Sequence, residues 1–113
     1  MLMKILVVKP MEVPEIIEID GSLESMQKVV GGLIQAIYPF DDDIALICNE
    51  EGKLNGLQLN RALYDCNEKM YDIVAGNFFL CQAPAESEEF EGLTDEQIKK
   101  YKEKYSKIEI WLK

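Results

Sequence analysis

Residues 44–49 read IALICN, and the first five of them are apolar. A strand that is apolar on both faces is usually an interior strand, covered by other parts of the molecule on both sides. The segment that follows, residues 49–53, has the composition of a hairpin loop, in which Gly52 is expected to adopt a positive φ. A return strand is therefore expected from Leu54 onward, and the turn signal Asn55-Gly56 predicts that it is very short or bulged.

Apolar runs punctuated by proline, glycine and capping residues predict the rest of the secondary structure. We expect strands at residues 3–9, 15–19, 33–40, 71–74, 78–81 and 107–113, helices at 23–30 and 94–105, and a helical turn at 60–64. Thr94 and Gln97 form a capping box at the start of the second helix. Phe78 and Phe79 point to opposite faces of one strand, so one of them is expected to be exposed. Because helices are few, we predict the α+β class, with a mostly antiparallel sheet of about five to six strands and two helices packed on it.

The length and composition are those of one globular unit. The chain has 113 residues, of which 48% are hydrophobic and 29% charged, so it is long enough to bury a substantial core. Residues 1–113 are therefore predicted to form a single α+β domain. Residues 86–92 contain several acids and no base, and we expect them to form a mobile acidic loop.

The charge balance argues against several classes of function. The formal net charge is −9, and there is no histidine. Binding to nucleic acid depends on lysine and arginine displacing counterions from phosphates, so no direct nucleic-acid binding is expected, and a role on a membrane surface is disfavoured for the same reason. The missing histidine excludes Ser-His-Asp and Cys-His catalysis and His-ligated zinc.

The three cysteines are Cys48, Cys66 and Cys81, and no two of them form a CxxC pair. The N-terminal residues lack a secretory signal, and no run approaches the roughly 18 apolar residues that span a membrane. We therefore expect a cytoplasmic protein with reduced thiols. Cys48 and Cys81 lie in strand-like runs and are expected in the core, whereas Cys66 lies in a polar turn and is expected to be exposed.

Three adjacent carboxylates, Asp41 to Asp43, follow the aromatic corner Tyr38-Pro39-Phe40. They lack the alternate spacing and the later glutamate of a calcium-binding loop, so we interpret them as turn residues whose side chains bond the backbone. Neither a phosphate-binding glycine loop nor a hydrolase or metalloprotease motif is found. No metal or cofactor is expected.

Arg61 is the one arginine of the chain, and it follows Asn60. A guanidinium can hold a carboxylate or a phosphate with two parallel hydrogen bonds. Arg61 is interpreted either as the intramolecular partner of an acid such as those at 41–43 or as a contact to a ligand. Since the aromatic corner and the Asn60-Arg61 pair flank the same expected hairpin, we predict that they form one polar site. The candidate ligand- or partner-binding residues are Tyr38, Asp41, Asp42, Asn49, Asn60 and Arg61.

Two long segments carry a resemblance to a known family. Residues 38–65, YPFDDDIALICNEEGKLNGLQLNRALYD, and residues 71–81, YDIVAGNFFLC, resemble the bacterial domain of unknown function 3846 family, and MKILVV (3–8) and LTDEQIKKY (93–101) also fit it. The positions that match its pattern are Tyr38, Pro39, Phe40, Asp41, Asn49, Gly52, Gly56, Asn60, Arg61, Gly76 and Phe79. The resemblance implies a compact α+β domain with an accessory role in phages and mobile elements, and it implies no mechanism.

Three hypotheses on function remain after the sequence has been considered. The first is a non-enzymatic binding module for a protein or a small anionic ligand. The second is an acidic decoy that imitates DNA and occupies a host defence enzyme, which requires carboxylates in a row at phosphate-like intervals. The third and least favoured is a carboxylate-based hydrolase, which requires a pocket and a carboxyl group of raised pKa. The expected strand at 107–113 could also pair with its copy in a homodimer.

Overall fold

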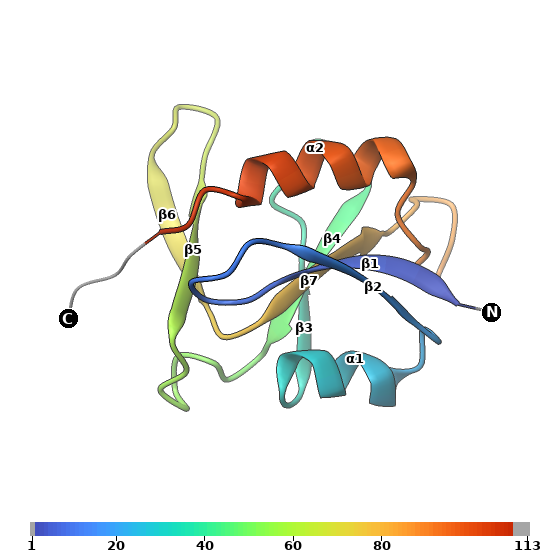
Figure 1. Cartoon of the computed structure of the whole chain (residues 1–113), viewed down its shortest axis with the longest axis horizontal. Coiled ribbons are helices and arrows are strands. Elements are labelled where there is room, and N and C mark those ends of the chain that lie inside the picture. The colour runs from blue at the N-terminus through green and yellow to red at the C-terminus, as the bar shows by residue number, and fades with distance from the viewer. Residues whose placement is uncertain (1, 110–113) are drawn as a thin grey trace.

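The computed structural model describes residues 2–109, which form two sheets and two helices (Figure 1). In chain order the elements are β1 (Met3–Val8), β2 (Glu15–Ile19), α1 (Leu23–Val30), β3 (Ile34–Ile37), β4 (Ile44–Asn49), β5 (Leu59–Tyr64), β6 (Met70–Ala75), β7 (Phe78–Gln82) and α2 (Asp95–Tyr105). Both predicted helices are confirmed, and most of the predicted strands are present within one or two residues of the expected ends, although β3 is shorter than expected.

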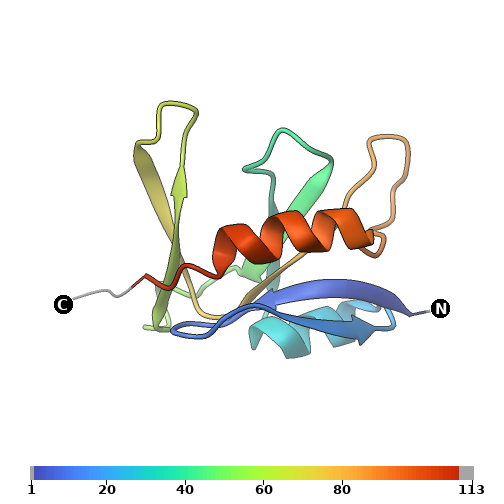
Figure 2. The ribbon, with the colours of Figure 1, turned by 45° about the horizontal axis from the view of Figure 1, so that its top comes forward.

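Five of the strands form one antiparallel sheet in the order β2-β1-β7-β4-β3. The other two strands, β5 and β6, form a separate antiparallel hairpin that stands beside the large sheet (Figure 2). The predicted α+β class with a mostly antiparallel sheet is therefore confirmed. The expectation of a return strand beside β4 after Leu54 is wrong, because β7 and β3 already occupy the two sides of β4.

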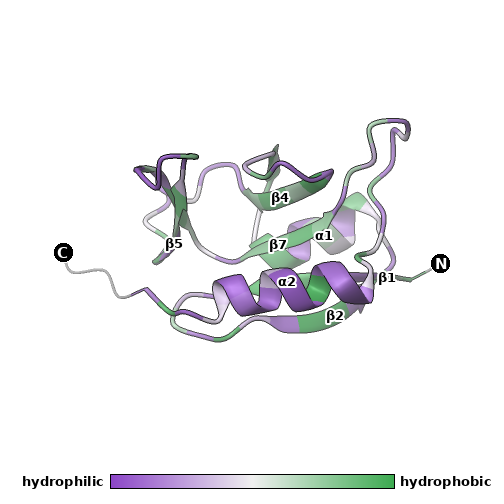
Figure 3. Ribbon diagram, turned by 90° about the horizontal axis from the view of Figure 1, so that it is seen from above, coloured by the Kyte–Doolittle hydropathy of each residue, from purple (hydrophilic) through white to green (hydrophobic). Residues whose placement is uncertain are grey.

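β4 is the interior strand that its IALICN sequence predicts, and all six of its residues are buried. Alternate side chains enter two separate apolar clusters: Leu46 packs on the side that α2 covers, and Ile47 on the side that α1 covers. Figure 3 shows the apolar β4 and β7 and the mostly hydrophilic outer surface of α2. The sheet therefore has a core on each face, as a strand without a polar side requires.

Phe78 and Phe79 show why β7 occupies the centre of this sheet. Phe78 joins the cluster under α2 and Phe79 the cluster against α1, and each side chain is 0% exposed. The expectation that one of the two is exposed is wrong, because both faces of the sheet are covered. Leu80 and Cys81 continue the same alternation between the two clusters.

Both helices begin where the capping residues predict. Ser22 accepts a hydrogen bond from the backbone N–H of Ser25 at the start of α1, and Gly31 ends the helix in the left-handed conformation with φ 80°. At the start of α2, the Thr94 hydroxyl accepts from the N–H of Gln97 and the Gln97 side chain accepts from the N–H of Thr94. This reciprocal pair confirms the predicted capping box.

The segment expected to form a helical turn, residues 60–64, is part of β5. β5 pairs with β6, and an irregularity in register lies between Leu59 and Arg61. The polar pair Asn60-Arg61 hides the strand in the sequence, because a buried strand is expected to be apolar. The backbone N–H and C=O groups of this segment form hydrogen bonds with β6. The sequence of residues 60–64 alone does not indicate this pairing.

Two glycines shape the segment that joins β4 to β5. The positive φ expected at Gly52 occurs instead at Gly56, with φ +69°. Gly52 is required for a different reason, because a Cβ there would lie 2.7 Å from the backbone oxygen of Ala75 in β6. The segment after β4 therefore packs directly on the hairpin.

The acidic loop and the C-terminal segment complete the described chain. Glu91 exchanges two backbone hydrogen bonds with Gln82, and Leu93 N–H donates to the carbonyl of Lys4, so the end of the 86–92 loop is fixed to the large sheet. The mobility predicted for the rest of that loop stays a prediction. Most of the predicted strand at 107–113 lies outside the described residues, and its described part, residues 107–109, is irregular. Within residues 2–109 no helix is long and apolar enough to cross a membrane.

Candidate functional site

The six predicted site residues lie in three different places. Asn60 and Arg61 are buried in β5, Asn49 ends β4, and the exposed Tyr38 and Asp41 lie with Asp42 in the connection between β3 and β4. Asp42 accepts hydrogen bonds from two side chains of α2, whereas Arg61 donates to the side chain of Asn60 and to two backbone carbonyls. The hydrogen bonds of Asp42 and Arg61 therefore go to different partners, and both the single polar site and its contact with a ligand stay predictions.

Arg61 fastens the hairpin to the rest of the molecule. Its guanidinium donates to the backbone carbonyls of Glu12, at 2.7 Å, and Tyr105, at 2.8 Å, and to Oδ1 of Asn60, at 2.8 Å. The side chain is 0% exposed, and burial lowers its pKa. Arg61 is thus an intramolecular partner, but of carbonyl oxygens and not of the carboxylates at 41–43. Its buried Nε has no hydrogen-bond partner in the part of the chain that the structure describes, so the contact is incompletely satisfied.

Asn60 completes the same attachment. Its side-chain amide donates to the carbonyl of Val8, at the end of β1, and to that of Gly76, which precedes β7, both at 2.9 Å. A buried carbonyl without a donor costs about 1–3 kcal/mol, so both contacts matter for stability. The Asn60-Arg61 pair is therefore a buried polar joint between the hairpin, the large sheet and the C-terminal end of α2.

Asp42 forms a second contact with α2, near the middle of that helix. Its Oδ2 accepts hydrogen bonds from Nζ of Lys100, at 2.7 Å, and from the hydroxyl of Tyr101, at 2.9 Å. The Lys100 ammonium and then the Tyr101 hydroxyl lower the pKa of Asp42. Within residues 2–109 no three His, Cys, Asp or Glu side chains gather closely enough to hold a metal ion. Of the three carboxylates at 41–43, that of Asp42 thus links the β3–β4 connection to α2.

Asn49 organises the turn after β4. Its Oδ1 accepts from the N–H of Glu51, at 2.8 Å, and its Nδ2 donates to the carbonyl of Val30 at the end of α1, at 3.3 Å. This buried side chain therefore has a structural role, and its predicted contact with a ligand stays a prediction. The residue also lines a hollow that the sequence did not predict.

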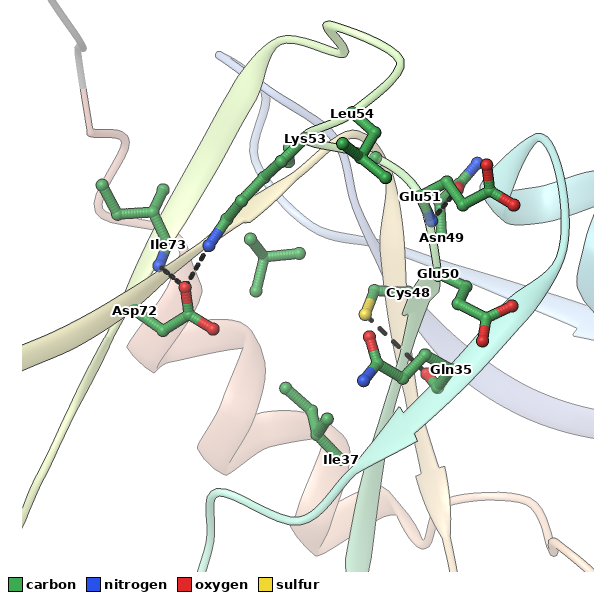
Figure 4. A pocket seen from close by; sticks show the side chains of 13 residues that line it. Gln35, Ile37, Cys48, Asn49, Glu50, Glu51, Lys53, Leu54, Asp72 and Ile73 are labelled. Carbon is green, nitrogen blue, oxygen red and sulfur yellow. Dashed lines mark hydrogen bonds and ion pairs between the residues drawn. The ribbon is translucent and has the colours of Figure 1, made fainter.

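That hollow lies between the α2-facing side of β3 and β4 and the strand β6, and we call it the inner hollow. It has a volume of about 170 Å³. Gln35, Ile37 and Cys48 come from β3 and β4, and Asp72 to Ala75 from β6, while residues 49–54 close one end (Figure 4). Cys48 is buried, and its burial and then the nearby Asp72 raise the pKa of its thiol.

An ion pair marks the β6 side of the inner hollow. Oδ1 of Asp72 accepts from Nζ of Lys53 and from the backbone N–H of Ile73, at 2.8 Å for the latter (Figure 4). The Lys53 ammonium is the main cause of the lowered pKa of Asp72. The Asp72 side chain is 47% exposed and that of Lys53 58%, so the pair is accessible to solvent and of the kind that contributes little to stability.

A second hollow adjoins the first across this ion pair, and we call it the outer hollow. It has a volume of about 400 Å³ and is lined by Leu59, Met70, Tyr71 and Ile73 together with the ion pair itself. Met70 and Tyr71, both more than half exposed, lie side by side in its lining. The two hollows and the edge of β6 between them form the candidate functional site, which we call the β6 groove.

Signals for this site are weak in the sequence. Lys53 and Asp72 are 19 positions apart, and Asp72 is one of 21 acids, so no spacing argument could select the pair. The one usable signal was Tyr71, an aromatic residue next to a charged one in an expected strand. The groove was missed because it depends on how two sheets pack against each other.

The fold and the groove define a small α+β protein in which a five-stranded antiparallel sheet, covered on both faces, carries a separate two-stranded hairpin. The family model described as "Domain of unknown function (DUF3846)" matches residues 3–106. The chain therefore belongs to that family, as its sequence resemblance indicated. Neither a curated protein nor a solved structure matches it.

Proposed function

We propose that this protein is a non-enzymatic binding module that recognises a protein partner through the β6 groove. The observation that carries the proposal is the pair of adjoining hollows along the outer edge of β6, which pairs with no strand within residues 2–109, next to the exposed side chains of Met70 and Tyr71. Large exposed apolar side chains gathered at one place are typical of interaction sites. Tyrosine in particular is enriched at the centres of protein interfaces.

The inner hollow is smaller than most pockets that enclose a small molecule. Pockets for small molecules usually measure about 300–1,000 Å³. A hollow of about 170 Å³ suits one or two side chains of a partner. The small anionic ligand that Arg61 suggested has no support at that residue, because the guanidinium is buried and donates to carbonyl oxygens.

Charge indicates what kind of partner fits. In residues 50–75 the exposed charged side chains are five carboxylates and two ammonium groups. The carboxylates are Glu50, Glu51, Asp65, Glu68 and Asp72, and the ammonium groups are those of Lys53 and Lys69. Since the whole chain also carries −9, a basic partner is attracted to this surface and an acidic one repelled.

The other two hypotheses have less support. A hydrolytic general acid requires a carboxyl of raised pKa, whereas the pKa is lowered at Asp20, Asp42 and Asp72. A DNA decoy requires uninterrupted rows of carboxylates, but lysines pair with acids at several points on the surface. These pairs are Lys4–Asp95, Lys9–Glu15, Lys53–Asp72 and Lys100–Asp42.

Selection from a random peptide display library tests the proposal. We expect peptides rich in lysine or arginine to be enriched on the immobilised protein. A groove variant carrying Gln35→Lys and Tyr71→Lys should bind these peptides at least about tenfold more weakly, a loss of about 1.4 kcal/mol in binding free energy. A control variant carrying Ile16→Lys and Leu23→Lys changes the net charge equally at exposed positions of β2 and α1. Equal loss on both variants, or no enrichment at all, would contradict a binding function of the groove.

A further inference from the structure

We propose that the partner binds as an added β-strand: an extended basic segment pairs with the outer edge of β6 and takes the place of Lys53 on Asp72. This inference rests on the proposed function and names the class of partner. It follows from the backbone at the edge, from the two hollows beside it and from the charges around it.

The outer edge of β6 has a backbone N–H, that of Ile73, which a new strand could bond after displacing the side chain of Asp72. In the register of the hairpin, Ile73 lies opposite Ala62. The N–H of Ile73 donates to the side chain of Asp72, and that of Ala62 to the side chain of Glu109, at 3.1 Å. At this pair of residues both N–H groups are therefore bonded to carboxylates on the outside of the hairpin. On the β6 side that carboxylate is exposed and held by one lysine, so an incoming strand can displace it.

The hollows match the geometry of an added strand. Successive side chains of an extended chain point to opposite faces of a sheet. A strand paired with β6 would direct one side chain toward the inner hollow, beside Ile37 and Val74, and its neighbour toward the outer hollow, beside Leu59 and Tyr71. Two adjacent apolar residues of the partner would therefore fill both hollows. A helix, with 3.6 residues per turn, would present only one face to the edge.

The charges select a basic segment. Figure 4 shows Asp72 on one side of the inner hollow and the carboxylates of Glu50 and Glu51 on the other. Strand addition frees Asp72 from the N–H of Ile73, and a lysine or arginine of the partner can replace Lys53 as the cation on that carboxylate. Like charges placed opposite each other on strands are destabilising, so an acidic segment is excluded at the same place.

The probe for this inference is the peptide Lys-Lys-Val-Ile-Lys-Lys with blocked ends, titrated into the whole protein by calorimetry. We expect it to bind and its counterpart Glu-Glu-Val-Ile-Glu-Glu not to bind. Two further versions carry N-methyl groups on alternate backbone amides, one version for each alternate set. Because alternate N–H groups of a strand face its neighbour, one version should lose at least about tenfold in affinity and the other should keep its affinity. Equal affinities of the two versions, high or low, would overturn the inference.

Lysine variants test the displacement step separately. We expect Lys53→Met to raise the affinity for the basic peptide about threefold to fivefold, because Asp72 no longer has to be released from its internal partner. Lys69→Met removes the same charge from the hairpin turn without touching Asp72 and is the matched control. An equal rise in both variants, or no rise in either, would contradict displacement. Failure of every peptide to bind the groove refutes the proposed function, whereas binding without the N-methyl pattern refutes only the added strand.

Discussion

The five-stranded sheet and the hairpin are held in place by different kinds of interaction. Apolar side chains on both faces hold β4 and β7, each cluster being covered by its own helix. The hairpin contributes Leu63 and Val74 to one cluster, and polar contacts hold it as well, among them the buried polar joint of Asn60 and Arg61. Hydrophobic contacts tolerate small shifts, whereas hydrogen bonds to particular carbonyls fix one position. The difference suggests a rigid base and a hairpin whose orientation, and with it the groove, depends on a few polar contacts.

The largest effect is expected from truncating the core of the large sheet. Phe79→Ala removes a fully buried ring from the cluster that α1 covers and should lower the free energy of unfolding by about 3–5 kcal/mol. Denaturant unfolding followed by circular dichroism measures this change. A loss below about 1 kcal/mol would mean that the cluster is not the stabilising core described here.

A smaller and more local effect is expected at the polar joint. Arg61→Met keeps much of the side-chain volume but leaves the carbonyls of Glu12 and Tyr105 without their donor. We expect a loss of about 1–3 kcal/mol, since relief from burying a charge offsets part of the cost of the unpaired carbonyls. Amide hydrogen exchange should accelerate in β5 and β6 much more than in β4 and β7. Uniform acceleration over both sheets would contradict a joint that acts mainly on the hairpin.

Acid should weaken the fold through carboxylates whose pKa is lowered. The hydroxyl and then the backbone N–H of Ser22 lower the pKa of Asp20 from 3.8 to about 2. The unfolded chain therefore takes up this proton at a higher pH than the folded protein does, and the stabilisation is complete above about pH 4 and lost as the pH falls toward 2. Thermal unfolding from pH 5 to pH 2 should show a shallower acid decline for Asp20→Asn than for the wild type, with Glu86→Gln as the control. An unchanged decline would show that the Ser22 contact is absent in solution.

The smallest effect concerns the three thiols, which report how open each region is. Cys66 is exposed and should react first with an aromatic disulfide reagent. Cys81 lies in the core of the large sheet, where burial raises its pKa to about 12, and Cys48 lines the inner hollow. We expect Cys48 to react more slowly than Cys66 and faster than Cys81, in a time course resolved by mass spectrometry. Reaction of Cys81 before Cys48 would contradict the more open packing under the hairpin.

The elements that could be predicted are those whose cause is local. IALICN shows by composition alone that both sides of β4 are buried, and Thr94 and Gln97 are close enough in sequence to reveal the start of α2. The separation of the hairpin from the large sheet could not be predicted, because strand pairing depends on residues far apart in the chain. The same holds for Asn60, whose amide bonds the carbonyl of Val8, 52 positions away.

The candidate site was harder to predict than the fold. Asn60 and Arg61 stand out in the sequence, but both donate to backbone carbonyls, which have no signature in a sequence. The groove depends on Lys53, Asp72 and an unpaired strand edge, and each of these looks ordinary until β6 is placed against β3 and β4. The sequence therefore marked Asn60 and Arg61 as unusual without showing that they lie in a strand, and both the joint and the groove required the structure.

Chemical-shift mapping of the isotope-labelled protein with the peptide Lys-Lys-Val-Ile-Lys-Lys tests the central claim most directly. If the edge of β6 is the binding surface, the largest changes will fall on Met70–Ala75 and on Lys53, and the amides of β2 will stay unchanged. Changes concentrated on the acidic loop 86–92, or spread evenly over the acidic surface, would show that the peptide is attracted by charge alone and that the groove is not a binding site.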